Sequence, residues 1–266
     1  MRPIIALITD YGTKDPYVAQ IKAVILRYRD DAAIIDVTHE VESFNELEAA
    51  FLMKTYVEHM PPGTIHVCVI DPGVGAGRKG IIIATERGDM FIGPDTGFMI
   101  PAARKLGIKK IYMIDGSRLP PRTSETFHGR DVFAHVAGRL ARGEPPEKVG
   151  KETLDYKVLD IPSPTVTDGK IEGRIMHVDK FGNLITNIMP DELESIGKLN
   201  GEFVVKYRGR EISCRWVKSY GWVKEGEYLL VEGGTGYIEL SINRGNAAEK
   251  TGLKVGDKLT IQHAGD

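Results

Sequence analysis

The fold is decided by the opening stretch Pro3-Ile4-Ile5-Ala6-Leu7-Ile8-Thr9-Asp10-Tyr11-Gly12. Its apolar part, residues 3–8, has the length and composition of a short buried strand, and the polar residues after it are typical of a loop. Apolar residues then return at helical spacing, at Val18, Ile21, Ile25 and Tyr28. A strand, a loop and an amphipathic helix in this order predict the first unit of an α/β sheet.

The same alternation continues to about residue 142. The pattern predicts strands at 33–37, 64–70 and 109–114, and helices at 45–59, 96–106 and 131–142. Residues 80–85 and 90–92 are typical of a hairpin that turns at Arg87-Gly88-Asp89. We therefore expect residues 1–160 to form a mainly parallel α/β sandwich with helices on both faces of the sheet.

The composition changes after Pro145. The stretch Asp160-Ile161-Pro162-Ser163-Pro164 is typical of a linker, which we place at 161–168. Beyond it, short strand-like runs alternate with turn signals such as Asp168-Gly169, and only 191–196 has a helical pattern. Residues 169–266 are therefore expected to form a smaller, antiparallel, β-barrel-like domain.

Composition limits the possible partners. A formal net charge of -2 over 266 residues provides no basic field for nucleic acid or an anionic membrane. The longest apolar runs are far below the roughly 20 residues that span a bilayer, and the residues from Met1 have no signal-peptide pattern. Cys68 and Cys214 form no C-x-x-C pair, which favours a reducing cytoplasm. We expect a cytoplasmic protein with a small-molecule partner.

No metal is expected, because the histidines show neither H-x-x-H nor H-E-x-x-H spacing. Chemistry is instead expected in loops after strands, since ligands bind at the carboxyl ends of strands in α/β sheets. The first such loop contains Asp10 and Asp15. A carboxylate in the position of Asp10 can accept hydrogen bonds from both hydroxyls of a ribose. Asp15 precedes Pro16, so a role as a helix cap stays open.

The second loop is Asp71-Pro72-Gly73-Val74-Gly75-Ala76-Gly77-Arg78. Its glycines do not indicate a dinucleotide site, because a strand is predicted after them where that motif requires a helix. They let the backbone approach a ligand closely. Asp71 and Arg78 can face each other across this loop, either as part of a site or as a structural ion pair.

The third loop runs from Thr126 to Asp131 and contains His128. A loop histidine can titrate near neutral pH and transfer a proton, although a structural role is the alternative. Asp131 can be a carboxylate at a helix N-terminus.

In the β half, Asp179 and Asn183 surround one turn, and Tyr220 and the Asn246-Ala247 pair can contact a base. Ordinary turns and core packing would explain these residues equally well.

Six motifs in one order resemble a known family. They are T-D-Y-G-x-x-D at 9–15, V-x-V-I-D-P-G-V-G-x-x-R at 67–78, G-P-D-T-G at 93–97, T-F-H-G-R-D-V-F at 126–133, V-D-x-F-G-N-x-x-T-N at 178–187 and N-x-G-N-A-A at 243–248. The chain is similar over nearly its whole length to the S-adenosylmethionine (SAM) hydroxide adenosyltransferases. These adenosine-forming SAM hydrolases are relatives of the SAM halogenases.

The resemblance implies an α/β domain followed by a β-barrel-like domain, assembled as a homotrimer with SAM bound between subunits. It implies water attack at the ribose C5' with release of adenosine and L-methionine, and no cofactor, since SAM is the substrate. The catalytic positions that it implies are Asp71, Arg78 and His128. It assigns the ribose to Asp10 and Asp15, a place near the ligand to Phe44, methionine to Asp179 and Asn183, and adenine to Tyr220, Asn246 and Ala247.

Two alternatives follow from other features. The related halogenases would use a halide in place of water, but Asp71 stands where they typically have a tyrosine, and a carboxylate repels an anion. The second alternative is a non-catalytic module that binds a nucleoside or a peptide. The stretch 245–257 resembles part of a PDZ domain, which would make the β half a module that binds peptides by strand addition. That resemblance covers about 15 residues and lacks the loop that binds a peptide carboxylate.

Overall fold

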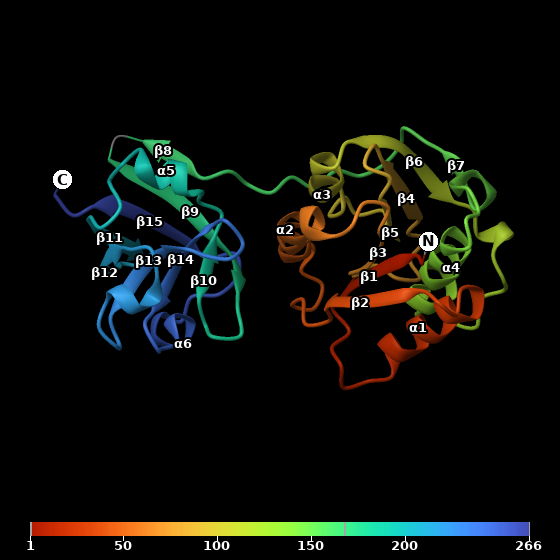
Figure 1. Ribbon diagram of the computed structural model, residues 1–266, viewed down its shortest axis with the longest axis horizontal. Coiled ribbons are helices and arrows are strands. Elements are labelled where there is room, and N and C mark those ends of the chain that lie inside the picture. The colour runs from red at the N-terminus through yellow and green to blue at the C-terminus, as the bar shows by residue number, and fades with distance from the viewer. Residues whose placement is uncertain (1, 168, 266) are drawn as a thin grey trace. The chain divides into compact units, whose positions relative to one another are not determined.

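The computed structural model describes residues 2–167 and 169–265. The chain forms two compact units, Met1–Ile161 and Pro162–Asp266 (Figure 1). Asp168, the last residue of the expected linker and part of an expected turn, lies outside the described residues, as do Met1 and Asp266. No helix in the described ranges is long and apolar enough to cross a membrane.

Unit 1 is built on one mixed sheet. In the described part of the chain it has seven strands in the order β2-β1-β3-β5-β4-β6-β7. The strands are β1 (Ile4–Thr9), β2 (Ala33–Thr38), β3 (Ile65–Val69), β4 (Gly80–Thr85), β5 (Met90–Pro94), β6 (Ile108–Ile114) and β7 (Gly150–Glu152).

Pairings from β2 through β1 and β3 to β5 are parallel, and those from β5 through β4 and β6 to β7 are antiparallel. The expected hairpin explains the change of direction, because the short turn between β4 and β5 can only reverse the chain.

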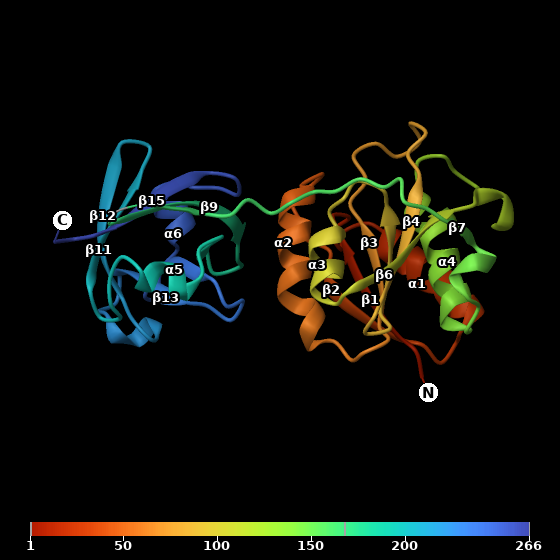
Figure 2. The ribbon, with the colours of Figure 1, turned by 90° about the horizontal axis from the view of Figure 1, so that it is seen from above.

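Helices cover both faces of this sheet, as the pattern predicts (Figure 2). On one face α1 (Tyr17–Tyr28) packs with α4 (Ala134–Ala141), and on the other α2 (Glu46–Tyr56) packs with α3 (Ile100–Lys105). Strand β1 is buried on both sides for this reason: Ile5 and Leu7 join the first core, and Ile8 joins the second. Helix α3 is shorter than expected, because Gly97 adopts a φ of +95° before it.

The remaining turns of unit 1 are short. The expected helix 131–142 begins earlier, as the π-helical turn η3 (Gly129–Phe133), and continues as α4. Turns of this kind frequently occur at functional sites. The 3-10 turns are η1 (Val57–His59), η2 (Gly116–Arg118) and η4 (Pro146–Lys148).

Unit 2 is a barrel. In the described residues, seven strands follow one another in the order β10-β14-β13-β12-β11-β15-β9, and pairing of β9 with β10 closes the ring. The short β8 pairs with β9 outside the ring. Within the described part all pairings are antiparallel except that of β12 with β13. The expected β-barrel-like architecture is confirmed.

The elements of unit 2 are β8 (Thr165–Thr167), β9 (Lys170–Val178), β10 (Leu184–Thr186), α5 (Pro190–Glu194), β11 (Glu202–Tyr207), β12 (Arg210–Trp216), η5 (Tyr220–Trp222), β13 (Tyr228–Glu232), β14 (Ile238–Ile242), α6 (Ala247–Thr251) and β15 (Lys258–His263). The expectation of helix only at 191–196 is wrong, because α6 is a second one. Asn246 caps it by accepting a hydrogen bond from Glu249 N, and Gly252 ends it in the left-handed region. Five residues are too few for a helical period to be recognised.

Candidate active site

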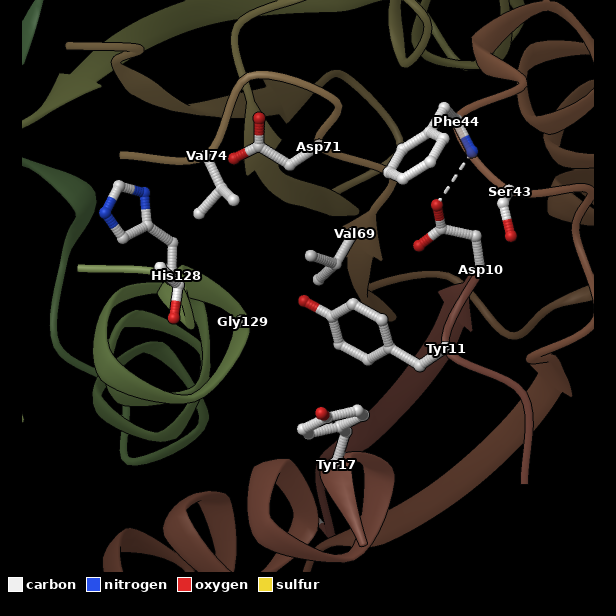
Figure 3. Close-up of a pocket in the computed structure, with 11 residues that line it drawn as sticks. Asp10, Tyr11, Tyr17, Ser43, Phe44, Val69, Asp71, Val74, His128 and Gly129 are labelled. Atoms are coloured by element: carbon white, nitrogen blue, oxygen red, sulfur yellow. Dashed lines mark hydrogen bonds between the residues drawn. The ribbon is translucent and has the colours of Figure 1, made fainter. Parts of the chain in front are cut away.

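A cavity of about 240 Å³ lies in unit 1 beyond the carboxyl ends of β1 and β3 (Figure 3). It unites four residues singled out in the sequence: Asp10, Phe44, Asp71 and His128. Neighbouring parallel strands end at the same edge of a sheet, so loops that are distant in sequence meet there. The other lining residues include five from the motifs quoted above, namely Tyr11, Val69, Val74, Thr126 and Gly129, and two from outside them, Tyr17 and Ser43.

Asp10 joins two loops at this cavity. Its Oδ2 atom accepts a hydrogen bond of 2.9 Å from Phe44 N (Figure 3). Phe44 has a φ of 67°, which is rare for a bulky residue, and is 66% exposed. Burial raises the pKa of Asp10 above its ordinary value, and the nearby Asp71 carboxylate acts in the same direction. Two acidic groups thus share one small cavity.

Asp71 has a buried carboxylate with an unused acceptor. Its side chain is 6% exposed. The Oδ1 atom accepts a hydrogen bond from Gly73 N at 3.3 Å, whereas Oδ2 has no hydrogen-bond partner in the described part of the chain. Burial raises the pKa of Asp71, and this effect exceeds the opposing attraction of Arg78. A buried acceptor of this kind is costly unless a ligand or water occupies it.

Arg78 contacts this carboxylate from outside the cavity lining. Its Nε atom lies 3.4 Å from Asp71 Oδ1, and its Nη1 atom lies 3.3 Å from Glu46 Oε1. Gly73 makes the approach possible, because a Cβ at that position would collide with the Arg78 guanidinium. The pairing of Asp71 with Arg78 expected across this loop is therefore confirmed.

His128 is buried and immediately precedes η3. Figure 3 shows its ring and the Asp71 carboxylate turned toward the same space. Burial lowers the pKa of His128, the charge of Arg122 lowers it further, and Asp71 acts in the opposite direction. The ring is therefore neutral at neutral pH.

Two other expected residues of unit 1 have different surroundings. Asp15 is exposed and does not line the cavity, and the cap position of α1 is occupied by Pro16, not by Asp15. Asp131 accepts hydrogen bonds from the backbone of Thr123 and Ser124 and pairs with Arg130, which together keep its pKa well below the ordinary value despite its burial. Asp131 thus holds the segment before His128 in place.

A second cavity of about 670 Å³ lies in unit 2. Four sequence-predicted residues line it, namely Asp179, Asn183, Tyr220 and Asn246. Phe181, Ile242, Arg244 and Gly245 complete the lining, and Ala247 lies fully buried beside it at the start of α6.

Hydrogen bonds order the walls of this second cavity. Asp179 Oδ1 accepts from the backbone of Phe181 and Asn183, and Asp179 Oδ2 accepts from Asn183 Nδ2, each at 2.9 Å. Gly182 allows Asn246 to pack against this turn, because a Cβ there would collide with the Asn246 amide.

Tyr220 donates a hydrogen bond of 2.7 Å to the buried Glu239, which no sequence motif singles out. In the described ranges no group of His, Cys, Asp and Glu side chains has a metal-binding arrangement.

Comparison with known proteins assigns both units to one family. Residues 5–150 match the SAM hydroxide adenosyltransferase N-terminal domain, and residues 173–260 match the C-terminal domain of that family. The (R)-S-adenosyl-L-methionine hydrolase of Methanocaldococcus jannaschii is 36% identical, with 97% of this chain and 95% of the relative covered. A fluorinase of Actinopolyspora mzabensis is 28% identical over 74% of this chain and 75% of its own length.

A solved structure of an uncharacterised conserved protein from Thermotoga maritima superposes with a TM-score of 0.92 at 37% identity, covering 97% of this chain and all of the other. The stretch 245–257 that resembles a PDZ domain forms α6 and the turn that leads to β15, in the barrel that matches the C-terminal domain. The chain belongs to the SAM hydroxide adenosyltransferase family.

Proposed function

We propose that the chain hydrolyses S-adenosyl-L-methionine to adenosine and L-methionine. The observation that carries the proposal is Asp71, whose buried Oδ2 atom has no partner within the described residues and whose pKa is raised. A carboxylate in this state is suited to accept a proton from a bound water. Family membership and the similarity to relatives named (R)-S-adenosyl-L-methionine hydrolase support the same reaction.

The reaction is a nucleophilic substitution at the ribose C5'. The water oxygen forms a bond to C5', the C5'–S bond breaks, and its electron pair remains on sulfur, which leaves as the neutral thioether of methionine. A neutral leaving group requires no acid, so the difficulty lies in activating water. The water proton passes to Asp71 and then to solvent. No cofactor is required, because the sulfonium already activates C5'.

Each catalytic residue has a role that follows from its charge. Arg78, next to Asp71, stabilises the developing hydroxide character electrostatically. His128 and Asp71 orient the water and remove its proton, which places the nucleophile for attack. Asp10 binds the ribose hydroxyls, with Phe44 near the ligand, and we assign Asp15 to the ribose as well.

The second cavity supplies binding groups. We assign Asp179 and Asn183 to the methionine part of SAM, where a carboxylate suits the cationic amine. Tyr220, Asn246 and Ala247 are assigned to adenine. A cavity of 670 Å³ has the size of an ordinary small-molecule site, whereas the 240 Å³ of the first suits only the reacting part of SAM.

We propose a homotrimer in which SAM binds between subunits. The support is the number of exposed apolar side chains at these cavities, notably Phe44 and Phe181. The net charge of -2 argues against nucleic acid as a partner, and the buried thiols of Cys68 and Cys214 suit a cytoplasmic location.

Hydrolysis is favoured over halogenation, the alternative that the fluorinase similarity raises. Asp10 and Asp71 place two carboxyl groups in the cavity. A halide ion would be repelled by them and would gain no compensating cation in the lining, whereas water can donate to either.

The decisive test is incubation with SAM in ¹⁸O-labelled water, followed by chromatography and mass spectrometry. The R and S sulfonium epimers are supplied separately, each with and without chloride or fluoride. We expect labelled adenosine and methionine, with the R epimer preferred and no effect of halide. A 5'-halo product, or unlabelled adenosine, would overturn the proposal.

A further inference from the structure

His128 lines two cavities. One is the cavity of Asp10 and Asp71, and the other, of about 300 Å³, is lined in part by Gly75 and Gly77 of the 71–78 loop. Both include His128 in their lining. The second also contains Arg78, Arg122 and Glu125, so the far side of the imidazole meets charged groups. None of the roles assigned above involves Arg122 or Glu125.

Arg122 contacts His128 directly. The Nη1 atom of Arg122 lies 3.4 Å from His128 Nε2 and 2.8 Å from Glu125 Oε2. Guanidinium is only a donor, so Nε2 must be the acceptor in this hydrogen bond. A neutral imidazole that accepts at Nε2 carries its proton on Nδ1. In Figure 3 one ring nitrogen of His128 lies on the side of Asp71 and the other points away from it.

We infer that Arg122 is a positioning residue for the proposed hydrolysis, because its hydrogen bond holds His128 in the Nδ1–H form. The inference rests on the proposed function and gives His128 and Asp71 different roles toward the water. His128 donates a hydrogen bond from its Nδ1–H to the oxygen of the water, and Asp71 Oδ2 accepts the proton that the water loses. His128 stays neutral throughout, and Asp71 alone is the base.

The charges around His128 support this division. Arg122 and Glu125 face the ring from the segment before it, Asp71 from the loop after β3, and Asp131 from η3. Burial is the largest effect and lowers the pKa of His128, and Arg122 is the next largest in the same direction. The neutral ring that the hydrogen bond requires is therefore the stable form.

The test is ¹⁵N NMR of His128 in the full-length protein, compared with the variants Arg122→Met and Arg122→Lys. In the wild type we expect an unprotonated Nε2 and a protonated Nδ1. Arg122→Met removes the donor and the charge, so the tautomer preference weakens and the pKa of His128 rises. Arg122→Lys keeps the charge and restores the lower pKa. Arg104→Met, which removes an exposed arginine on α3, is the matched control.

Glu125→Gln provides a second, independent arm. Glu125 raises the pKa of His128, so its loss lowers that pKa, opposite in sign to Arg122→Met. In turnover, Arg122→Met is expected to lower kcat about five- to tenfold with the KM for SAM unchanged, since the lost interaction orients water and not substrate. A purely structural role would not produce opposite titration shifts in the two variants.

The outcomes separate this inference from the proposed function. A protonated Nε2 in the wild type, or an unchanged tautomer and titration in Arg122→Met, overturns the inference even if SAM is hydrolysed. Failure of the wild type to form adenosine overturns the proposed function, and the NMR result then still decides whether Arg122 sets the tautomer.

Discussion

Two buried aspartates, Asp71 and Asp89, have pKa values shifted in opposite directions. Asp71 follows β3 at its carboxyl end, whereas Asp89 precedes β5 at the other end of the parallel strands. Their side chains are 6% and 0% exposed. Burial acts to raise both pKa values. At Asp71 the effect of burial is the larger one, and the pKa is raised. At Asp89 hydrogen bonds from His66 and Arg87 outweigh burial and lower the pKa to about 2.

The difference lies in partners, not in burial. Arg87 donates to both oxygens of Asp89 at 2.8 Å, and His66 Nε2 lies 3.3 Å from Oδ1. His66 is itself fixed by stacking on Phe91 at 4.5 Å. A buried carboxylate with all its acceptors satisfied stabilises the fold, and one with an unused acceptor is available for chemistry.

The largest expected effect is that of Asp71→Asn. Turnover should fall about 10²- to 10⁴-fold, because the base for the water is lost. The melting temperature should not fall, since an amide replaces a charge whose burial is unfavourable. Adenosine release and calorimetry measure the two effects. Turnover close to that of the wild type would place Asp71 with the structural carboxylates.

Asp89→Asn should lower stability and leave turnover unchanged, the reverse of Asp71→Asn. We expect the free energy of unfolding to fall by about 3 kcal/mol, because the Arg87 pair is broken, with kcat per folded molecule unchanged. Asp31→Asn, in an exposed ion pair with Arg29, is the control. Since the pKa of Asp89 is depressed, its contribution is complete above the unfolded value of 3.8 and is lost as pH falls toward about 2. Urea titrations across that range test the sign.

The variant Arg78→Met tests the state of Asp71 through the pH dependence of kcat. The proposed reaction requires ionised Asp71, so we expect kcat to fall as pH drops through the raised pKa of that residue. Arg78 lowers this pKa, and its removal should therefore move the acidic limb to higher pH and reduce the plateau about 10- to 100-fold. Stopped-time assays over a pH series measure both effects. If the acidic limb of the pH profile of kcat does not move in Arg78→Met, a group other than Asp71 controls that limb.

The smallest expected effect is that of Tyr220→Phe in unit 2. Glu239 lies between these two cases: burial raises the pKa of its carboxyl, and the hydrogen bond from Tyr220 is the largest effect that opposes burial. Loss of that bond should raise the pKa of Glu239 further. The KM for SAM should rise about two- to fivefold with kcat unchanged. A drop in kcat alone would contradict the assignment of this cavity to binding.

Much of the fold was predictable because it depends on local patterns. The hairpin of β4 and β5 and the helices on both faces follow from apolar spacing and turn residues in 80–92 and its surroundings. Asp10, Asp71 and His128 were predictable as candidates for one cavity because they lie in loops after predicted strands or before a helix. Arg122 and Glu239 were not, since only contacts through space distinguish them from other charged residues.

The order of strands and helices, the change to a β barrel and the motifs of the family can be read from the chain alone, because each depends on residues that are neighbours in sequence. Which of several similar side chains has an unpaired oxygen depends on the folded arrangement. Asp71 and Asp89 have the same chemistry and comparable burial, yet Arg87 satisfies both oxygens of one and Arg78 reaches one oxygen of the other. Protonation depends on such contacts, because desolvation and hydrogen bonding act through space.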